Sequence, residues 1–148
     1  MMQSSQPTAK EEDLQIIVQD RLRQFEPLRT LGGQLSVDIL PEGKVEVAGI
    51  VQTKLIREEA LALVNQTPGV TDVLSNVLTD PEIEVSVAEV LATDDRTKSI
   101  KPGMISVRSH LGSVTLLGQI PAETDRETVV RVVGSVSGVR TIVDELQT

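Results

Sequence analysis

The 148-residue chain contains no cysteine, tryptophan or tyrosine, and Phe25 is its only aromatic residue. Without cysteine it can form no disulfide, no thiolate zinc site and no cysteine nucleophile. Because large aromatic side chains are missing, a core must be built from small aliphatic ones. Valine, with 21 copies, is the main candidate, and its β-branched side chain suits strands and close packing of helices on sheets.

The chain also lacks an excess of basic residues. Fourteen Lys and Arg stand against 22 Asp and Glu, for a net charge of −8, and residues 1–79 and 80–148 each carry seven basic and eleven acidic side chains. Nucleic-acid binding needs a positive footprint for the phosphates, so we expect no nucleic-acid partner. The same balance argues against a simple polybasic attachment to anionic lipid.

Long apolar runs are missing as well. None approaches the about 18 residues of a membrane-spanning helix. The first residues have neither the apolar core nor the basic start of a secretory signal. We therefore expect a cytoplasmic location, or a periplasmic one if a leader has been removed.

What the chain does have is an internal repeat. The pattern that begins at Val45 returns at Val114, and this repeat spacing holds without a gap to the end of the chain. In both copies a strand pattern containing a glycine precedes a helical pattern, a Gly-Val pair and a last strand pattern. One unit is thus written twice, and units as small as about 70 residues are marginally stable alone.

Each copy predicts the order helix–strand–strand–helix–strand. In the first copy, apolar residues at helical spacing from Leu14 to Phe25 predict a helix that ends at Pro27, followed by a flexible loop to Gln34. Alternating apolar residues predict strands over 35–39 and 45–51. A second helix begins at Thr53 as N-cap, and a third strand covers 70–78.

In the second copy, Asp80 as N-cap and Pro81 at the first helical position predict the start of a helix. The segment 83–91 fits a strand by its alternation and a helix by its wider spacing. Because the repeat spacing aligns it with the first predicted helix, we interpret it as a helix. Residues 94–103 form a polar loop, and Thr124 and Glu127 have the spacing of a capping box.

One detail does not repeat. The apolar positions of the first strand, 35, 37 and 39 in one copy and 105 and 107 in the other, differ by one residue against the fixed spacing. Since a one-residue shift changes which face is buried, we expect a bulge or a hairpin loop of different length there.

We therefore predict an α+β fold of two tandem α-β-β-α-β units, each a three-stranded mixed sheet with two helices on one face. The first unit spans residues 11–79 and the second residues 80–148, after a flexible tail over residues 1–10.

The recurring glycines and arginines are the first candidate site residues. Gly49 and Gly118 interrupt strands, which favours a bulge or a close approach of two backbones, and Gly69 and Gly138 favour helix C-caps. Arg57 and Arg126 could meet an anionic headgroup or, as we favour, pair with local carboxylates on a solvated helix face. The glycines could also shape a binding edge.

Catalytic and metal chemistry have little support in the sequence. His110 is the only histidine and lies in a predicted hairpin turn, with no second histidine or cysteine to complete a transition-metal site. Acidic pairs such as Asp94-Asp95 lack the spacing of a calcium loop. We therefore expect no enzyme activity, no cofactor and no metal site.

Apolar residues in the predicted loops and turns are candidates for a surface that binds a membrane or a partner. They can equally close the open end of a small sheet. They are Leu28, Leu31, Ile100, Met104 and Leu111.

With these residues in place, the repeat resembles the BON domain, a family of bacterial osmotic-stress, nodulation and secretion-associated proteins. The resemblance covers about residues 11–148 and rests on equivalent positions of the two copies. In the first they are Val45, Val47, Gly49, Val51, Arg57, Gly69, Val70 and Val73, and in the second Val114, Leu116, Gly118, Ile120, Arg126, Gly138, Val139 and Ile142. It implies the α-β-β-α-β fold and a non-catalytic module that acts at membrane phospholipids or in protein assembly.

Three functions follow as hypotheses. The first is a tandem interaction module that docks at phospholipid membrane surfaces, as in stress responses. The second is a protein–protein or oligomerisation scaffold, including a homo-oligomer. The third is a sensor of a small ligand or cation, since an acidic chain favours cations.

Overall fold

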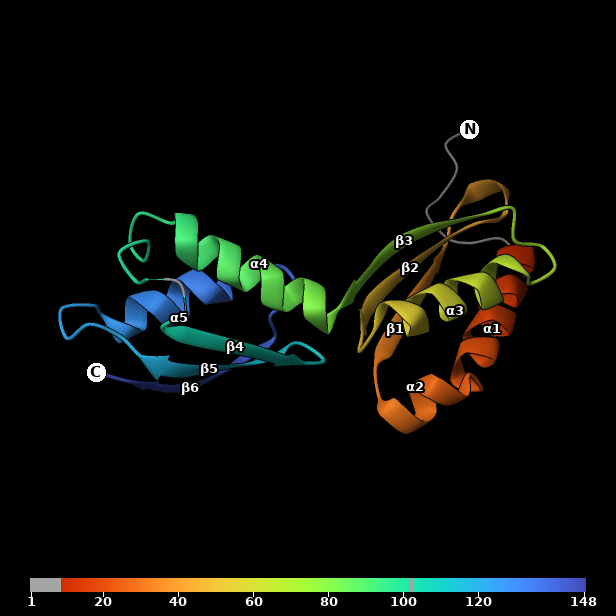
Figure 1. Cartoon of the computed structure of the whole chain (residues 1–148). Coiled ribbons are helices and arrows are strands. Elements are labelled where there is room, and N and C mark those ends of the chain that lie inside the picture. Colours follow the sequence, from red (N-terminus) through yellow and green to blue (C-terminus); the bar gives the residue numbers. More distant parts are fainter. Residues whose placement is uncertain (1–8, 102) are drawn as a thin grey trace, which may run out of the picture. The chain divides into compact units, whose positions relative to one another are not determined.

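The structure, a computed structural model, describes residues 9–101 and 103–148 (Figure 1). It divides into two compact units, with the boundary between Val77 and Leu78. The elements of the first are α1 (Ala9–Arg23), α2 (Glu26–Leu31), β1 (Gln34–Ile39), the 3₁₀ turn η1 (Pro41–Gly43), β2 (Lys44–Val51), α3 (Lys54–Asn65) and β3 (Asp72–Thr79). Those of the second are α4 (Asp80–Thr93), β4 (Ile105–His110), β5 (Ser113–Gln119), α5 (Arg126–Gly134) and β6 (Thr141–Gln147).

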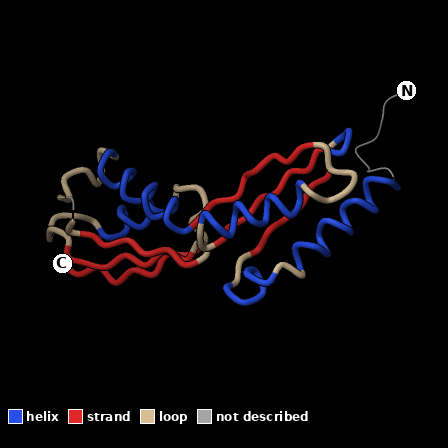
Figure 2. Tube along the Cα trace, turned by 45° about the vertical axis from the view of Figure 1, so that its right-hand side comes forward, coloured by secondary structure: helices blue, strands red, loops and turns tan. Residues whose placement is uncertain are grey.

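Each unit has one mixed three-stranded sheet, in the order β1-β2-β3 or β4-β5-β6. The first two strands of each form an antiparallel hairpin, and β5 pairs with β6 in parallel. Helices α1 and α3 lie on one face of the first sheet, and α4 and α5 on one face of the second; Figure 2 shows the helices in blue beside the red strands. The predicted α+β fold is confirmed, and 83–91 is helical as interpreted.

The core of each unit consists of small aliphatic side chains between the helices and the sheet. On the first sheet the inward residues Val45, Val47 and Val51 are fully buried. Their partners on the helices include Val18 of α1 and Val64 of α3, which are also fully buried. Burial of one such side chain stabilises the fold by about 1.5–3 kcal/mol. The second core repeats this arrangement with Ile83, Val87, Val114, Leu116, Val129, Val132 and Val133.

The two hairpin loops differ by one residue. In the first hairpin, the Leu40 amide donates to the Lys44 carbonyl at 2.7 Å across a loop of residues 41–43. In the second, His110 pairs with Ser113 across Leu111 and Gly112, whose φ angles of 51° and 88° are those of a tight hairpin turn. The parity shift in the first strand therefore reflects a difference in loop length, which is one of the two alternatives that the sequence left open.

Gly49 and Gly118 mark a close approach of two backbones. A Cβ on Gly49 would lie 2.0 Å from the Gln34 carbonyl oxygen, and one on Gly118 would lie 2.0 Å from the Met104 carbonyl oxygen. Their φ angles of 142° and 130° are also unfavourable for other residues. Of the two alternatives for the strand glycines, the structure shows the close approach; the predicted bulge is wrong, because strand pairing runs through both glycines in unbroken register.

Several predicted element ends need correction. Residues 27–31, predicted as loop, belong to α2 (Glu26–Leu31), because proline is tolerated in the first turn of a helix and here begins one. Thr53 caps α3 as predicted and accepts from the Ile56 amide at 3.2 Å. The cap of α4 is Thr79 rather than Asp80, and that of α5 is Asp125 rather than Thr124.

Gly69 and Gly138 do not cap helices. α3 ends with Gln66 as C-cap and α5 with Ser135, and both caps have ordinary right-handed φ and ψ. The positive φ falls in the next turn, at 98° for Gly69 and 92° for Gly138. In the first unit this turn is closed by the Val70 amide, which donates to the Thr67 carbonyl at 3.1 Å. The predicted tail over residues 1–10 lies outside the described residues except for its last two.

The close approach predicts the effect of Gly→Ala substitution at residues 49 and 118. Each variant is expected to lose about 1–3 kcal/mol of unfolding free energy, since the methyl group meets a backbone carbonyl and φ is strained. Gly134→Ala is the matched control: its Cβ would have only an ordinary contact at 3.7 Å, with the Ile142 side chain, and it lies in α5. The control should be neutral or more stable in urea unfolding. Equal midpoints for all three variants would contradict this.

Candidate functional site

The most connected buried polar group of the second unit is the Asp80 carboxylate at the start of α4. It is 6% exposed. It accepts from the Ser109 hydroxyl at 2.7 Å and from the amides of Leu111 and Gly112 at 2.8 and 3.3 Å. One turn along α4, the Glu84 carboxylate accepts from the Ser109 amide at 2.8 Å. These bonds attach the helix to the β4–β5 hairpin, and they satisfy the amides of the tight turn.

These residues do not assemble a catalytic triad. Ser109 points toward the helix layer, where its hydroxyl donates to Asp80. His110 is its neighbour on β4 and therefore lies on the opposite face of the sheet, away from the serine hydroxyl. Within residues 9–101 and 103–148, no group of three acidic or histidine side chains could hold a metal ion.

Arg57 and Arg126 have the same structural role in the two units. Arg57 donates to the Val77 carbonyl of β3 at 3.1 Å, and Arg126 donates to the Leu146 carbonyl of β6. Arg126 also lies 3.5 Å from the Asp144 carboxylate. Each arginine thus connects the second helix of its unit to the last strand. The sequence offered a headgroup or a nearby carboxylate as partner and missed these carbonyls, which belong to a later element of the chain.

The five predicted surface residues have different environments. Ile100 is buried, at 6% exposure, and so cannot belong to a binding surface; its amide donates to the Thr97 carbonyl, a turn that folds it inward. Leu28 is half-buried against the first core. Met104 and Leu111 are half-buried, and Leu31 alone of the five is largely exposed, at 48%. Ile100 and Leu28 therefore fit the alternative role better, in which loop residues close the open end of a small sheet.

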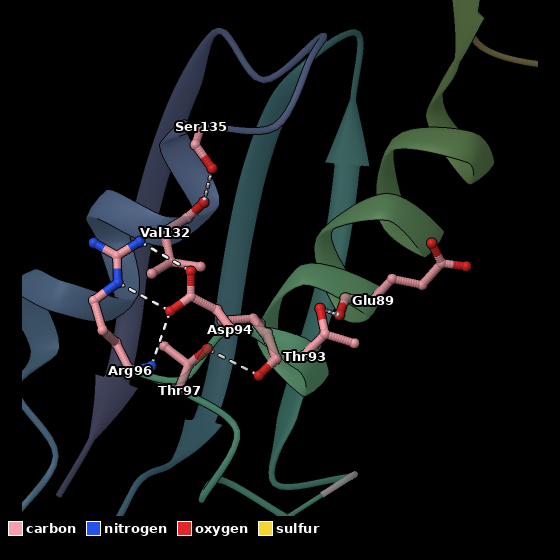
Figure 3. A network of polar contacts seen from close by, with 8 residues as sticks. Glu89, Thr93, Asp94, Arg96, Thr97, Val132 and Ser135 are labelled. Carbon is pink, nitrogen blue, oxygen red and sulfur yellow. Dashed lines mark hydrogen bonds and ion pairs between the residues drawn. The ribbon is translucent and has the colours of Figure 1, made fainter.

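The loop after α4 is held by a local ion pair, drawn in Figure 3. The Arg96 guanidinium donates to both oxygens of the Asp94 carboxylate at 2.9 Å, and the Arg96 amide donates to one of them. These hydrogen bonds lower the pKa of Asp94 to about 2, and the same contact raises the pKa of Arg96. The buried Thr97 hydroxyl donates to the Leu91 carbonyl at 2.9 Å, which ties the loop back to the helix.

Surface hollows lie at different places in the two units. In the first unit a crevice of about 500 Å³ is lined by Leu14, Ile17, Ile39, Gly43, Gly69 and the charged residues around them. In the second unit the Leu78 side chain lies 2.8 Å from the position of a Cβ on Gly138, the residue equivalent to Gly69. The hollow of the second unit, about 520 Å³, is lined instead by Glu84, Ser106, Arg108, His110, Ser113 and Thr115.

The sequence reasoning missed four exposed aliphatic side chains at equivalent positions. Ile16 of α1 and Val85 of α4 are separated by the repeat spacing and are 63% and 57% exposed. Leu74 of β3 and Val143 of β6 are separated by the same spacing and are 45% and 43% exposed. The sequence contained a signal for them. Each is an apolar residue that lies outside the predicted inward-facing positions, and an apolar residue stands at the equivalent position of the other copy. Among the helices that the structure describes, none is long and apolar enough to cross a bilayer.

Removal of the Asp80 carboxylate tests the role of this cluster. Asp80→Ala is expected to lower the unfolding free energy by about 2 kcal/mol, since two turn amides and a hydroxyl lose a charged acceptor. Asp95→Ala is the matched control, because Asp95 makes only an exposed ion pair with Lys98 at 2.8 Å, and its effect should stay within about 0.5 kcal/mol. Urea unfolding measures both. An Asp80 variant as stable as the control would show that the cluster is dispensable.

Comparison with known proteins supplies the family. The family model "BON domain" matches residues 31–79 and 79–148. No curated protein sequence matches the chain. The chain also matches two solved structures of CdsD, a structural protein of the type III secretion system of Chlamydia trachomatis. One is 15% identical with a TM-score of 0.40 over 91% of both chains, and the other, its C-terminal domain, is 14% identical with a TM-score of 0.39 over 97% of this chain and 99% of that one. With two adjacent matches that together span most of its length, the chain belongs to the BON domain family as a tandem of two domains.

Proposed function

We propose that this tandem BON chain is a non-catalytic scaffold that binds a protein partner through the outer surfaces of α1 and α4. The observation that carries the proposal is the exposed aliphatic residue at the same place on both helices, Ile16 and Val85. Single exposed apolar residues are common on protein surfaces. An exposed aliphatic residue recurs at this place in both units, although packing of the core does not require it, and this recurrence supports a shared use.

Two copies of one weak site suit a scaffold. A partner with two matching segments, or two partners held together, would gain from the tandem arrangement, because the second contact forms at a high effective concentration. The engagement of the Ser109 hydroxyl and the Asp80 carboxylate in holding the hairpin supports the non-catalytic part of the proposal. The net charge of −8 favours a partner with a basic or neutral surface.

Docking at a phospholipid surface is the second candidate. It is favoured by Leu31, which is exposed at the end of α2, and by Ile17, which is 46% exposed on α1. Insertion of such side chains would gain free energy from burial in the interface, although four net negative charges in each half oppose attraction to anionic headgroups.

Photo-crosslinking in the native host separates these candidates. A benzophenone amino acid placed at position 16 or 85 is expected to give the same protein adduct, since both positions contact the partner. The matched controls are positions 58 and 127, which are exposed, polar and equivalent by the repeat on the other helix of each unit, α3 and α5. Lipid adducts at position 31 would favour the membrane candidate. Equal adducts at all four helix positions, or none, would overturn the scaffold proposal.

A further inference from the structure

The outer faces of the two sheets carry opposite charge at equivalent places. In each hairpin a central pair points toward the helices, Val37 with Val47 in the first and Val107 with Leu116 in the second. The next pair toward the hairpin loop points away from the helices. In the first unit it is Asp38 opposite Glu46, and in the second it is Arg108 opposite Thr115.

The acidic pair of the first sheet is unfavourable in the isolated chain. Like charges directly opposite each other on a sheet destabilise it. Across the described ranges, no Lys, Arg or His lies within ion-pair distance of Asp38 or Glu46. The Glu46 carboxylate accepts a hydrogen bond from the Asn76 side chain, which is neutral. The pair would therefore gain from a cation supplied from outside.

The second sheet offers such a cation. Arg108 is exposed and, in the part of the chain that the structure describes, forms no ion pair. His110 is the next outward residue of β4 and is also exposed. The one acidic outward residue that the structure describes on this face, Glu145, lies on β6, two strands away from Arg108. The outer face of the first sheet, by contrast, is acidic on balance, since Lys44 stands there with Asp38, Glu46 and Asp72.

On each sheet an exposed aliphatic residue of the third strand lies next to the outward pair, Asp38 with Glu46 or Arg108 with Thr115. Val143 of β6 lies opposite Thr115, so that Arg108, Thr115 and Val143 form one row across the second sheet. On the first sheet Leu74 has the equivalent position of β3, next to the row of Asp38 and Glu46. When the two faces stack, Arg108 can lie against the acidic pair while Val143 lies against Leu74.

We propose that the outer face of the first sheet in one copy of this chain binds the outer face of the second sheet in another copy. Arg108 of one copy then lies against Asp38 and Glu46 of the other, and Val143 packs on Leu74. Every copy carries both faces, so the contact is head-to-tail and builds short chains or a ring. The surface differs from the helix surface of the scaffold proposal, and either proposal can fail alone.

The size of the contact sets its strength. A three-stranded sheet face of this length projects about 300 Å², less than the about 800 Å² per partner of stable complexes. The association is therefore weak, reversible and dependent on charge. We expect the average mass in sedimentation experiments to rise with concentration at about 20 mM salt and to fall back to the monomer at about 500 mM salt, where charges are screened.

Charge reversal provides the decisive test. Arg108→Asp, which places a carboxylate against the acidic pair, and the double variant Asp38→Arg/Glu46→Arg are each expected to remain monomeric where the natural chain associates. Mixed in equal amounts, they should associate again, because the carboxylate introduced at position 108 then faces the guanidinium groups introduced at positions 38 and 46. The original contact also returns in the mixture, between Arg108 of the double variant and the Asp38 and Glu46 side chains of the Arg108→Asp variant. Arg131→Asp is the matched control, since Arg131 is exposed on α5 away from both faces, and it should associate as the natural chain does.

Urea midpoints show whether the variants are folded. The double variant replaces one like-charge pair by another of opposite sign, so it should fold as the natural chain does. Restored association only in the mixture supports the proposal. A natural chain that stays monomeric at low salt and high concentration, or an Arg108→Asp variant that associates as well as the control, would overturn it.

Discussion

Burial of short branched side chains under a single layer of helices is the constraint on which the rest of this structure depends. Because the chain has almost no aromatic side chains, its helices must approach the sheet closely to exclude water. Gly138 allows a helix to come close, since a Cβ there would lie 3.0 Å from the Ile83 side chain of α4. Gly49 and Gly118 serve a different contact, the close approach of neighbouring strand backbones. Arg57 and Arg126 then fix the second helix of each unit to its last strand.

Repetition separates the residues that build the unit from those available for binding. Inward positions recur as aliphatic residues, because both cores have the same geometry. Outward positions are free to differ, and they do: the pair Asp38 and Glu46 corresponds to Arg108 and Thr115. Where an outward aliphatic residue nevertheless recurs, as at Ile16 and Val85, core packing does not explain it. Function in this chain is therefore expected on its outer surfaces rather than in a cavity.

The sequence predicts those features that depend on local pattern or on the repeat. The helix at 83–91 follows from its spacing to the first helix, and parity indicates either a bulge or a difference in loop length, of which the structure has the second. Contacts between distant segments have no such signal: nothing in the sequence relates Asp80 to the β4–β5 turn, which it holds through the Leu111 amide. Pro27 suggests the end of a helix, although proline also begins one. Ile100 is buried rather than exposed, because burial of loop residues depends on the path of the chain.

The central claim is that one small fold, with one set of internal contacts, is built twice. Amide hydrogen exchange of the intact chain, followed residue by residue, tests it most directly. The account predicts the slowest exchange at equivalent amides of the central strands β2 and β5. It also predicts protection of the Leu111 and Gly112 amides, which donate to the Asp80 carboxylate. Protection confined to one unit, or exchange of the Leu111 and Gly112 amides at the rate of an open chain, would contradict it.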